Sequence, residues 1–232
     1  MDEVRGGTAE LRGDDARNLA RVLRAEPGQK YEISDGCSVW LAEITETRGD
    51  RVVFCVEEPV ASPEIPVRIT LMPALVKFDR FEWTVEKATE LGVERIVPVA
   101  AARSEKGLFE ASQKRGERWR RIAREAGQQS RRLRPPEILP AVSFESALIE
   151  SADCRYFLEE STAAPLLSCL PPVRARASQV ALLVGPEGGW TESERQEAAA
   201  GFWIPVSLGP LVLRAETAAA AAVAIVLNAW SI

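Results

Sequence analysis

The feature that most constrains the fold is a regular alternation, beginning near residue 65, of short apolar runs with segments of helical periodicity. Apolar runs of about four to eight residues are typical of strands that are buried on both faces. Their alternation with helices predicts an α/β domain on a mostly parallel, two-sided sheet. The expected strands are 67–72, 95–100, 155–159, 180–184 and 203–208, and the expected helices are 79–91, 114–131, 191–200 and 217–230. Asp79 is the expected N-cap of the first of these helices.

The first 64 residues follow a different pattern. Short β-type runs at 31–33, 39–44 and 51–57 are separated by turn sequences, and one helix is expected over 14–24, before Pro27-Gly28. The segment 57–63 contains two prolines and no periodicity, so we interpret it as a linker. The chain therefore divides into an expected β-rich domain over 1–64 and an α/β domain over 65–232.

The expected N-terminal helix has two distinct faces. Leu19, Val22 and Leu23 are predicted to form its apolar face. Arg17, Arg21 and Arg24 recur at helical spacing on another face, where they are candidates for contact with RNA.

Composition excludes several classes of site. The 232 residues include no histidine, which removes the Ser-His-Asp triad, the usual zinc ligands and the commonest general base. Cysteines stand at 37, 55, 154 and 169 without a Cys-x-x-Cys pair, as expected of buried filler in a reducing cytoplasm, and no metal site is expected. No signal peptide is visible, and the most apolar stretch, 217–227, is shorter than the ~20 residues that span a bilayer.

A glycine-rich turn follows the expected strand 180–184. It reads Gly185-Pro186-Glu187-Gly188-Gly189, and a helix opens after it with Thr191 and Glu194 spaced as a capping box. Glycines at the carboxyl end of a buried parallel strand let the backbone approach a ligand closely. Neither Gly-x-Gly-x-x-Gly nor a phosphate-loop lysine is present, so a dinucleotide or a triphosphate is disfavoured. The turn is equally compatible with a purely structural role.

A second glycine turn precedes the last helix. The strand 203–208 leads into Gly209-Pro210, an apolar loop and then Arg214-Ala-Glu-Thr217. Glu216 stands where the helix dipole stabilises an acidic residue, which leaves a structural role open beside a catalytic one. Arg214 lies between an apolar loop and an apolar helix, where a buried unpaired charge is costly, and this suggests a function for it.

A basic cluster contrasts with the formal net charge of −5. Residues 114–134 contain nine lysines and arginines but only two glutamates. Trp119, Ile122, Ala123 and Ala126 mark the buried face of this helix, which leaves the arginines exposed. Arginine-rich surfaces suit phosphate, so Arg118, Arg121, Arg124 and Arg131 are predicted to contact RNA. A merely solvated face remains the alternative.

These blocks together resemble the family of 16S ribosomal RNA uracil-N3 methyltransferases, within the SPOUT superfamily. The pairing of the Gly-Pro-Glu-Gly-Gly turn with Leu-Arg-Ala-Glu-Thr-Ala is specific, and the matching motifs occur in order over nearly the whole chain. They are Arg21-Val-Leu-Arg24 with Pro27-Gly28, Phe81-Glu-Trp-Thr-Val-Glu-Lys-Ala-Thr-Glu-Leu-Gly-Val93, Glu125-Ala-Gly-Gln-Gln-Ser130, Gly185-Pro-Glu-Gly-Gly189, Leu208-Gly209 and Leu213-Arg-Ala-Glu-Thr-Ala218.

The resemblance implies a PUA-like β-barrel that helps to hold RNA, followed by a SPOUT domain whose last segment threads a trefoil knot. It implies a homodimer that binds S-adenosylmethionine through 158–161, 185–189 and 208–213. The residues expected to bind this cofactor are Leu158, Glu159, Gly185, Pro186, Glu187, Gly188, Gly189, Leu208, Gly209, Leu211, Leu213 and Thr217.

The implied reaction is methyl transfer to N3 of a uracil in 16S ribosomal RNA of the small subunit. It needs no metal, because a sulfonium is already a good leaving group. Arg214 is the candidate for stabilising charge on the base, and Glu216 or Glu187 for accepting the N3 proton. A SPOUT enzyme acting on another base or on a ribose hydroxyl, and a non-catalytic RNA-binding protein, are the alternatives.

Overall fold

A computed structural model describes residues 6–36, 38–61, 64–160, 163–175 and 178–231, and the chain separates into two units, Met1–Glu64 and Ile65–Ile232. Cys37 and Ser161 lie outside the described residues. The helices among the described residues are too short or too polar to cross a membrane. The roles assigned above to the two units remain predictions.

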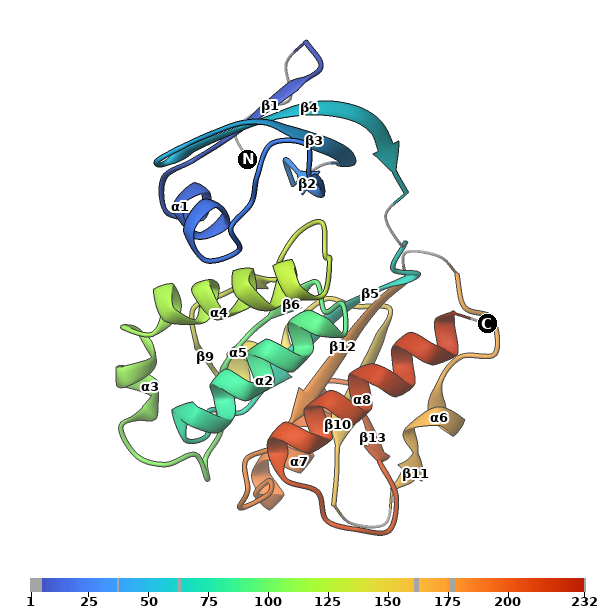
Figure 1. Ribbon diagram of the computed structural model, residues 1–232. Coiled ribbons are helices and arrows are strands. Elements are labelled where there is room, and N and C mark those ends of the chain that lie inside the picture. Colours follow the sequence, from blue (N-terminus) through green and yellow to red (C-terminus); the bar gives the residue numbers. More distant parts are fainter. Residues whose placement is uncertain (1–5, 37, 62–63, 161–162, 176–177, 232) are drawn as a thin grey trace. The chain divides into compact units, whose positions relative to one another are not determined.

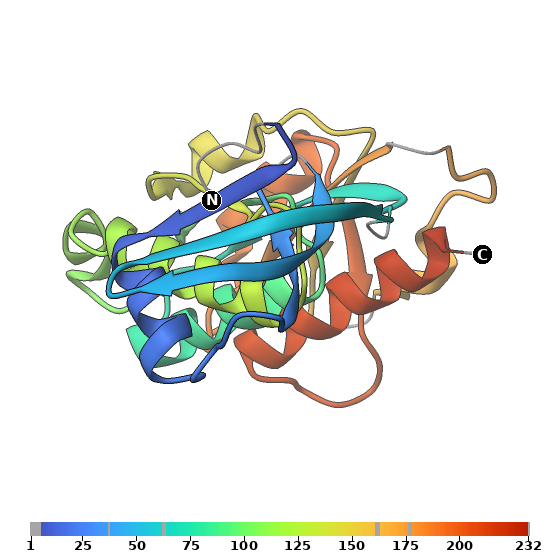
Figure 2. The ribbon, with the colours of Figure 1, turned by 45° about the horizontal axis from the view of Figure 1, so that its top comes forward.

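The first unit is a four-stranded antiparallel sheet with one helix. The strand order is β1-β4-β3-β2, and α1 connects β1 to β2 (Figures 1 and 2). Its apolar core includes Ile44 and Phe54, which are fully buried. The elements are β1 Thr8–Arg12, α1 Gly13–Arg21, β2 Lys30–Ser34, β3 Val39–Arg48 and β4 Arg51–Val60.

The structure of this unit differs from expectation in three places. The helix ends at Arg21, so Val22 and Leu23 are exposed and Arg24 has left-handed backbone (φ 51°) instead of extending the helical face. The strand β1 was not expected. Residues 57–60 belong to β4 and not to a linker, because they pair with the start of β3, and this cross-strand pairing outweighs the local signal of Pro59.

The second unit is built on a seven-stranded parallel sheet with the order β11-β13-β10-β12-β5-β6-β8, as the alternating pattern predicted (Figure 1). The strands are β5 Val67–Pro73, β6 Arg95–Ile96, β8 Glu137–Ile138, β10 Cys154–Leu158, β11 Ala164–Pro165, β12 Ser178–Val184 and β13 Ile204–Ser207, with β7 Val99–Ala100 and β9 Val142–Ser143 forming a separate pair. The helices are α2 Phe78–Glu90, α3 Leu108–Ser112, α4 Gly116–Gln129, α5 Phe144–Leu148, α6 Leu166–Cys169, α7 Glu192–Ala200 and α8 Ala215–Trp230.

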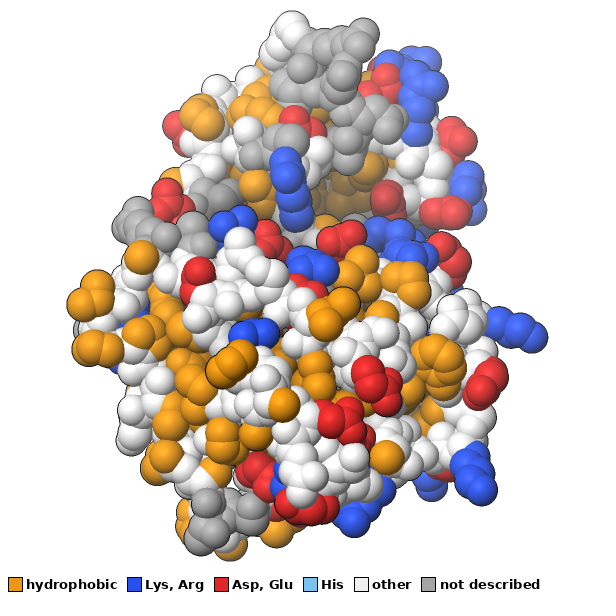
Figure 3. Space-filling model, turned by 180° about the vertical axis from the view of Figure 1, so that it is seen from behind, with side chains coloured by type: hydrophobic (Ala, Val, Ile, Leu, Met, Phe, Trp, Pro, Cys, Tyr) orange, Lys and Arg blue, Asp and Glu red, His pale blue; other side chains and the backbone are white. Residues whose placement is uncertain are grey.

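Both faces of the sheet are covered. Along β12, Val180, Leu182 and Val184 pack into a core with α2, α4 and α8, whereas Ala181 and Leu183 pack into a second core with α5 and α7. This strict alternation with burial on both sides is the reason that the strands are apolar throughout. On the side opposite α8, apolar side chains also reach the surface of this unit (Figure 3).

Element boundaries differ from expectation where local chemistry intervenes. The run 95–100 forms two short strands in different sheets, since Pro98 between them offers no backbone N–H to a ladder. Lys77, without a side-chain cap, is the N-cap of α2, and Asp79 lies in the first turn, where the helix dipole favours it. The helix expected over 114–131 begins at Gly116, and Arg131 adopts left-handed backbone after it (φ 55°).

Candidate functional site

A pocket that is open to solvent lies where β10, β12 and β13 end. Ligands in open α/β sheets bind at the carboxyl ends of parallel strands, so the fold predicts a ligand at this place. Three loops, 158–160, 184–190 and 208–213, supply most of its wall. The lining residues are Leu158, Glu159, Glu160, Val184, Gly185, Pro186, Gly189, Trp190, Arg195, Leu208, Gly209, Leu211, Val212, Leu213, Ala215 and Ala218.

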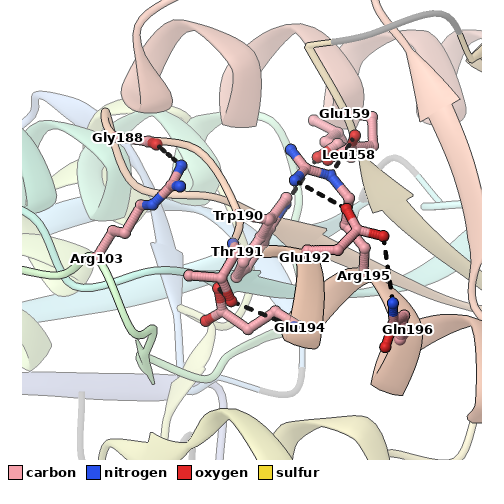
Figure 4. Close-up of polar contacts among 10 residues, drawn as sticks. All are labelled: Arg103, Leu158, Glu159, Gly188, Trp190, Thr191, Glu192, Glu194, Arg195 and Gln196. Atoms are coloured by element: carbon pink, nitrogen blue, oxygen red, sulfur yellow. Dashed lines mark hydrogen bonds and ion pairs between the residues drawn. The ribbon is translucent and has the colours of Figure 1, made fainter.

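The turn after β12 is shaped by Trp190. The indole is 1% exposed, stacks on Phe157 with ring centroids 4.7 Å apart, and donates Nε1–H to the carbonyl oxygen of Leu158 at 2.9 Å. A Cβ on Gly185 would lie 3.0 Å from this ring, so only glycine fits there without displacing it. Trp190 thereby holds two of the three loops in register (Figure 4).

One wall of the pocket is acidic. Glu159 has a side chain only 6% exposed and accepts from Nε of Arg195 at 2.9 Å, which raises the pKa of that arginine. Arg195 comes from α7, so the ion pair ties this helix to the end of β10 (Figure 4). Glu160 beside them is exposed and lines the same pocket. Glu160 therefore offers carboxylate oxygens to hydroxyl or amino groups of a ligand.

The capping box predicted at the start of α7 is confirmed. Thr191 Oγ1 accepts from the backbone N–H of Glu194, and the carboxylate of Glu194 accepts from the backbone N–H of Thr191 at 2.7 Å. Glu194 is only 4% exposed, and its other oxygen accepts from the backbone N–H of Ala102 at 2.8 Å. The carboxylate thus joins the 101–104 turn to the loop that follows β12.

Nine residues expected to bind a cofactor line this one pocket, and three do not. Glu187 is 41% exposed and forms an ion pair with Arg80, on the first turn of α2. Gly188 directs its carbonyl to Arg103 Nη1 at 2.7 Å, and Thr217 is exposed on α8. The nine that line the pocket are Leu158, Glu159, Gly185, Pro186, Gly189, Leu208, Gly209, Leu211 and Leu213.

The structure reverses the expected burial of the last acidic and basic pair. The side chain of Arg214 is 71% exposed, so the premise of a buried charge at this position is wrong. Glu216 is the more buried partner, with a side chain 12% exposed and Nη1 of Arg214 4.0 Å from its Oε1. Its Oε2 is buried and has no hydrogen-bond partner among the described residues. Ala215 and Ala218, on either side of it in sequence, line the pocket.

Sequence reasoning missed Trp190, Arg195 and Arg103. Trp190 directly follows the glycine turn, and a large aromatic residue next to glycines is a signal of close packing that could have found it. Arg195 and Arg103 gave no such signal, because each gains its role from a partner distant in sequence. The pocket also includes Val184, Ala215 and Ala218.

The basic residues of α4 differ in how far neighbours compensate them. Arg118 forms a bidentate ion pair with Glu82, at 2.5 and 2.7 Å, which raises the pKa of the arginine. Arg121 lies 3.9 Å from Glu125. Arg124 has no ion pair among the described residues, and Arg132, also counted in the cluster, is structural because it donates to two backbone carbonyls at 2.9 Å.

The arginines of α1 and of the turn after it are exposed. Arg17 pairs with Asp14 and lies 3.8 Å from Asp50, so its charge is locally balanced. Arg21 and Arg24 are exposed, and they do not share the helical face that the sequence suggested. Their contact with RNA remains a prediction.

Comparison with known proteins finds a matching family model and several relatives of similar length. A model described as an RNA methyltransferase domain matches residues 63–227. The ribosomal RNA small subunit methyltransferase E of Bacillus subtilis is 30% identical and is matched over 91% of this chain and 86% of its own length. The protein of that name from Aquifex aeolicus is also 30% identical, over 98% and 97% of the two chains.

Solved structures give the same result. The crystal structure of a ribosomal RNA small subunit methyltransferase E from Neisseria gonorrhoeae, bound to S-adenosyl methionine, superimposes with a TM-score of 0.85. It is 30% identical and the match covers 98% of this chain and 95% of that one.

Proposed function

Because this chain belongs to the family of ribosomal RNA small subunit methyltransferases E, we propose that it transfers the methyl group of S-adenosylmethionine to N3 of a uracil in 16S ribosomal RNA. The observation that carries the proposal is the pocket at the ends of β10, β12 and β13. It gathers, from three loops, nine of the residues that the family resemblance assigns to the cofactor.

The chemistry of the pocket suits S-adenosylmethionine. Leu158, Leu208 and Leu213 offer apolar surface for an adenine ring, and the glycine at 185 keeps the backbone accessible. The exposed carboxylate of Glu160 suits ribose hydroxyls, an ammonium group and a positively charged sulfonium, beside the ion pair of Glu159 with Arg195. When bound, the cofactor supplies an activated methyl group, and the protein supplies orientation and electrostatics.

Methylation at N3 requires the loss of the N3 proton, and we assign its acceptance to Glu216. Its buried Oε2 lacks a hydrogen-bond partner among the described residues and is thus an unused acceptor, whereas Glu187 is held by Arg80. To Arg214, which is exposed and 4.0 Å from Glu216, we assign the stabilisation of negative charge on the base oxygens. The structural alternative is that the pair only fixes the start of α8.

The proposal extends to the architecture and to the partners. The first unit would be a PUA-like barrel that helps to hold RNA, which its antiparallel strands β1–β4 support. A trefoil knot at the C-terminus is supported by β13, which joins the sheet beside β10 before α8 returns to pack on β5 and β12. Leu211 and Val212 are 78% and 73% exposed at the rim of the pocket, as expected if a second subunit covers them in a homodimer.

The test is nucleoside analysis by mass spectrometry of 16S ribosomal RNA and of small subunits after incubation with protein and S-adenosylmethionine. We expect this incubation to yield 3-methyluridine. In the living cell we expect the same reaction to take place in the cytoplasm. Methylation of a ribose hydroxyl or of another base would instead identify a different SPOUT activity. Binding of RNA without any methyl transfer would indicate a non-catalytic protein.

The role of Arg214 has its own test. Arg214→Lys keeps the charge but loses the planar guanidinium, so we expect turnover to fall about 100-fold, as for the loss of one oxyanion donor. Affinity for S-adenosylmethionine, measured by calorimetry, should stay within about twofold. If cofactor affinity and melting temperature fall while turnover at low temperature is normal, Arg214 only fixes α8.

A further inference from the structure

Arg103 differs from Arg80 and Arg195, two other arginines near the pocket, because its hydrogen-bond partner is not a carboxylate. The charges of Arg80 and Arg195 are matched by Glu187 and Glu159. Arg103 is exposed, and its hydrogen bond goes to a neutral group, the carbonyl oxygen of Gly188, at 2.7 Å. In the part of the chain that the structure describes, no carboxylate forms an ion pair with it.

The guanidinium of Arg103 lies at the rim of the pocket. A Cβ placed on Gly189 would be 4.0 Å from Arg103 Nη1 and 3.7 Å from Oε2 of Glu160. Both Gly189 and Glu160 line the pocket, so the arginine stands just outside the wall that they form. Glu159 and Glu160 line the pocket, whereas Arg103 is not among the lining residues and points its guanidinium toward the carbonyl of Gly188 (Figure 4).

A buried carboxylate holds this arginine in place. Arg103 belongs to the turn 101–104, in which Ser104 N–H donates to the carbonyl oxygen of Ala101 at 3.0 Å. Glu194 accepts from the backbone N–H of Ala102 at 2.8 Å and at the same time completes the capping box of α7. The capping box uses one oxygen of the Glu194 carboxylate, Oε2. The other oxygen of this 4% exposed side chain, Oε1, holds the turn that carries Arg103.

Resting on the proposed function, we propose that Arg103 binds the RNA substrate at the rim of the pocket, through an oxygen of the target nucleotide, and that Glu194 is its positioning residue. The oxygen is either a phosphate oxygen or a carbonyl oxygen of the base, and a guanidinium donates to both. One N–H of Arg103 holds Gly188, and for the others the part of the chain that the structure describes supplies no partner.

The experiment compares the full-length wild type with Arg103→Gln, Arg103→Lys, Glu194→Gln and the double variant Arg103→Gln/Glu194→Gln. Glu197→Gln is the matched control, because that glutamate lies on α7 but accepts from Ser193, away from the pocket. For each we would measure RNA affinity between 50 and 200 mM salt (roughly the range over which phosphate contacts are resolved), affinity for S-adenosylmethionine, turnover and melting temperature.

We expect Arg103→Gln to lose about 10- to 100-fold in RNA affinity or turnover, the usual effect of removing one charged hydrogen bond. Affinity for S-adenosylmethionine should stay within about twofold. Arg103→Lys should fall in between, since it keeps the charge without the fork. A flatter salt dependence, by roughly 0.7 to 0.9 in slope, identifies a phosphate oxygen, and an unchanged slope with lower turnover identifies a base oxygen.

Glu194→Gln should lower RNA affinity in the same direction, because an amide offers one acceptor oxygen where three donors now converge. The double variant should be no worse toward RNA than Arg103→Gln alone, since a residue that acts only through Arg103 has nothing further to lose. Additive losses would show that Glu194 has only a structural role.

Two results overturn the assignment of Arg103. One is an unchanged RNA affinity and turnover in Arg103→Gln; the other is a parallel loss of cofactor affinity and turnover, which would show that the arginine merely anchors the glycine loop. In both, the wild type still methylates RNA. A wild type that transfers no methyl group would instead refute the proposed function, so the two failures are distinguishable.

Discussion

Replacing Gly185 by alanine is the sharpest test of how the pocket is built. The new Cβ would stand 3.0 Å from Cε2 and 3.1 Å from Nε1 of Trp190, closer than the carbon–carbon contacts of about 3.5–4.0 Å found in well-packed cores. The indole is 1% exposed and lies against Phe157 and Phe144, so it cannot turn aside without disturbing the second core. Overpacking of this kind costs about 1–3 kcal/mol.

A second cost follows if the ring moves. The hydrogen bond from Trp190 to the carbonyl oxygen of Leu158 is 2.9 Å long and buried, and an unsatisfied buried group costs about 1–3 kcal/mol. With about 2–4 °C per kcal/mol for a chain of this size, we expect Gly185→Ala to melt at least about 4 °C below the wild type. Because Leu158 lines the pocket, affinity for S-adenosylmethionine should fall at least about tenfold.

Calorimetry and thermal unfolding measure both effects. Gly116→Ala is the control, since its Cβ would meet only the flexible end of Arg120, and alanine in a helix gains about 0.5–1 kcal/mol over glycine. In a Trp190→Ala background, the cost of Gly185→Ala should shrink, because the ring that the new Cβ would crowd is absent. Wild-type melting and cofactor affinity in Gly185→Ala would refute the argument.

Three further predictions concern the ion pairs and hydrogen bonds of arginine side chains. Arg124→Gln should weaken RNA binding and flatten its salt dependence more than Arg118→Gln, whose guanidinium is already held by a glutamate; equal effects in filter binding would contradict this. Arg51, with Arg12, lowers the pKa of Glu10 to about 2, so the carboxylate stabilises the first unit above about pH 4.5 and this contribution is lost as the pH falls toward 2. Acid unfolding should therefore separate the wild type from Glu10→Gln at about pH 5, where exposed carboxyls are still mostly ionised, and bring them together near pH 2. Arg132→Leu should cost about 1–3 kcal/mol in urea unfolding, because the carbonyl of Val93, just beyond α2, loses the side-chain donor that the structure gives it, and the carbonyl of Thr89 loses one of its donors.

Features with a local cause could be predicted from the sequence. The capping box of Thr191 and Glu194 is a contact between residues three apart, and the buried face of α4 follows from helical periodicity around Trp119. The parallel sheet follows from alternating apolar runs, since such strands must be covered on both faces. Each of these depends on spacing within about one helical turn or one strand.

Features that depend on distant partners could not be predicted. The glutamate that compensates Arg118 is 36 residues away, and the arginine that holds Glu187 is 107 residues away. The basic cluster around α4 therefore contains residues of very different availability. The expected burial of Arg214 was wrong for a related reason. Its neighbours in sequence are apolar, but it is the N-cap residue of α8 and its side chain is 71% exposed.

The first turns of α7 connect the segments that the proposed reaction must align. Trp190, just before the helix, bonds to the end of β10, and Arg195 pairs with Glu159 on the same loop. Glu194 between them reaches in the other direction, to the turn that carries Arg103. The start of α7 thus contacts both the loop that lines the cofactor pocket and the rim where we place the RNA.

The strain that Gly185→Ala introduces should consequently lower the affinity for RNA as well as the affinity for the cofactor, whereas Arg103→Gln should lower the affinity for RNA alone. A Gly185→Ala protein that loses cofactor affinity but keeps full RNA affinity in the absence of cofactor would show that the two contacts of α7 are mechanically independent.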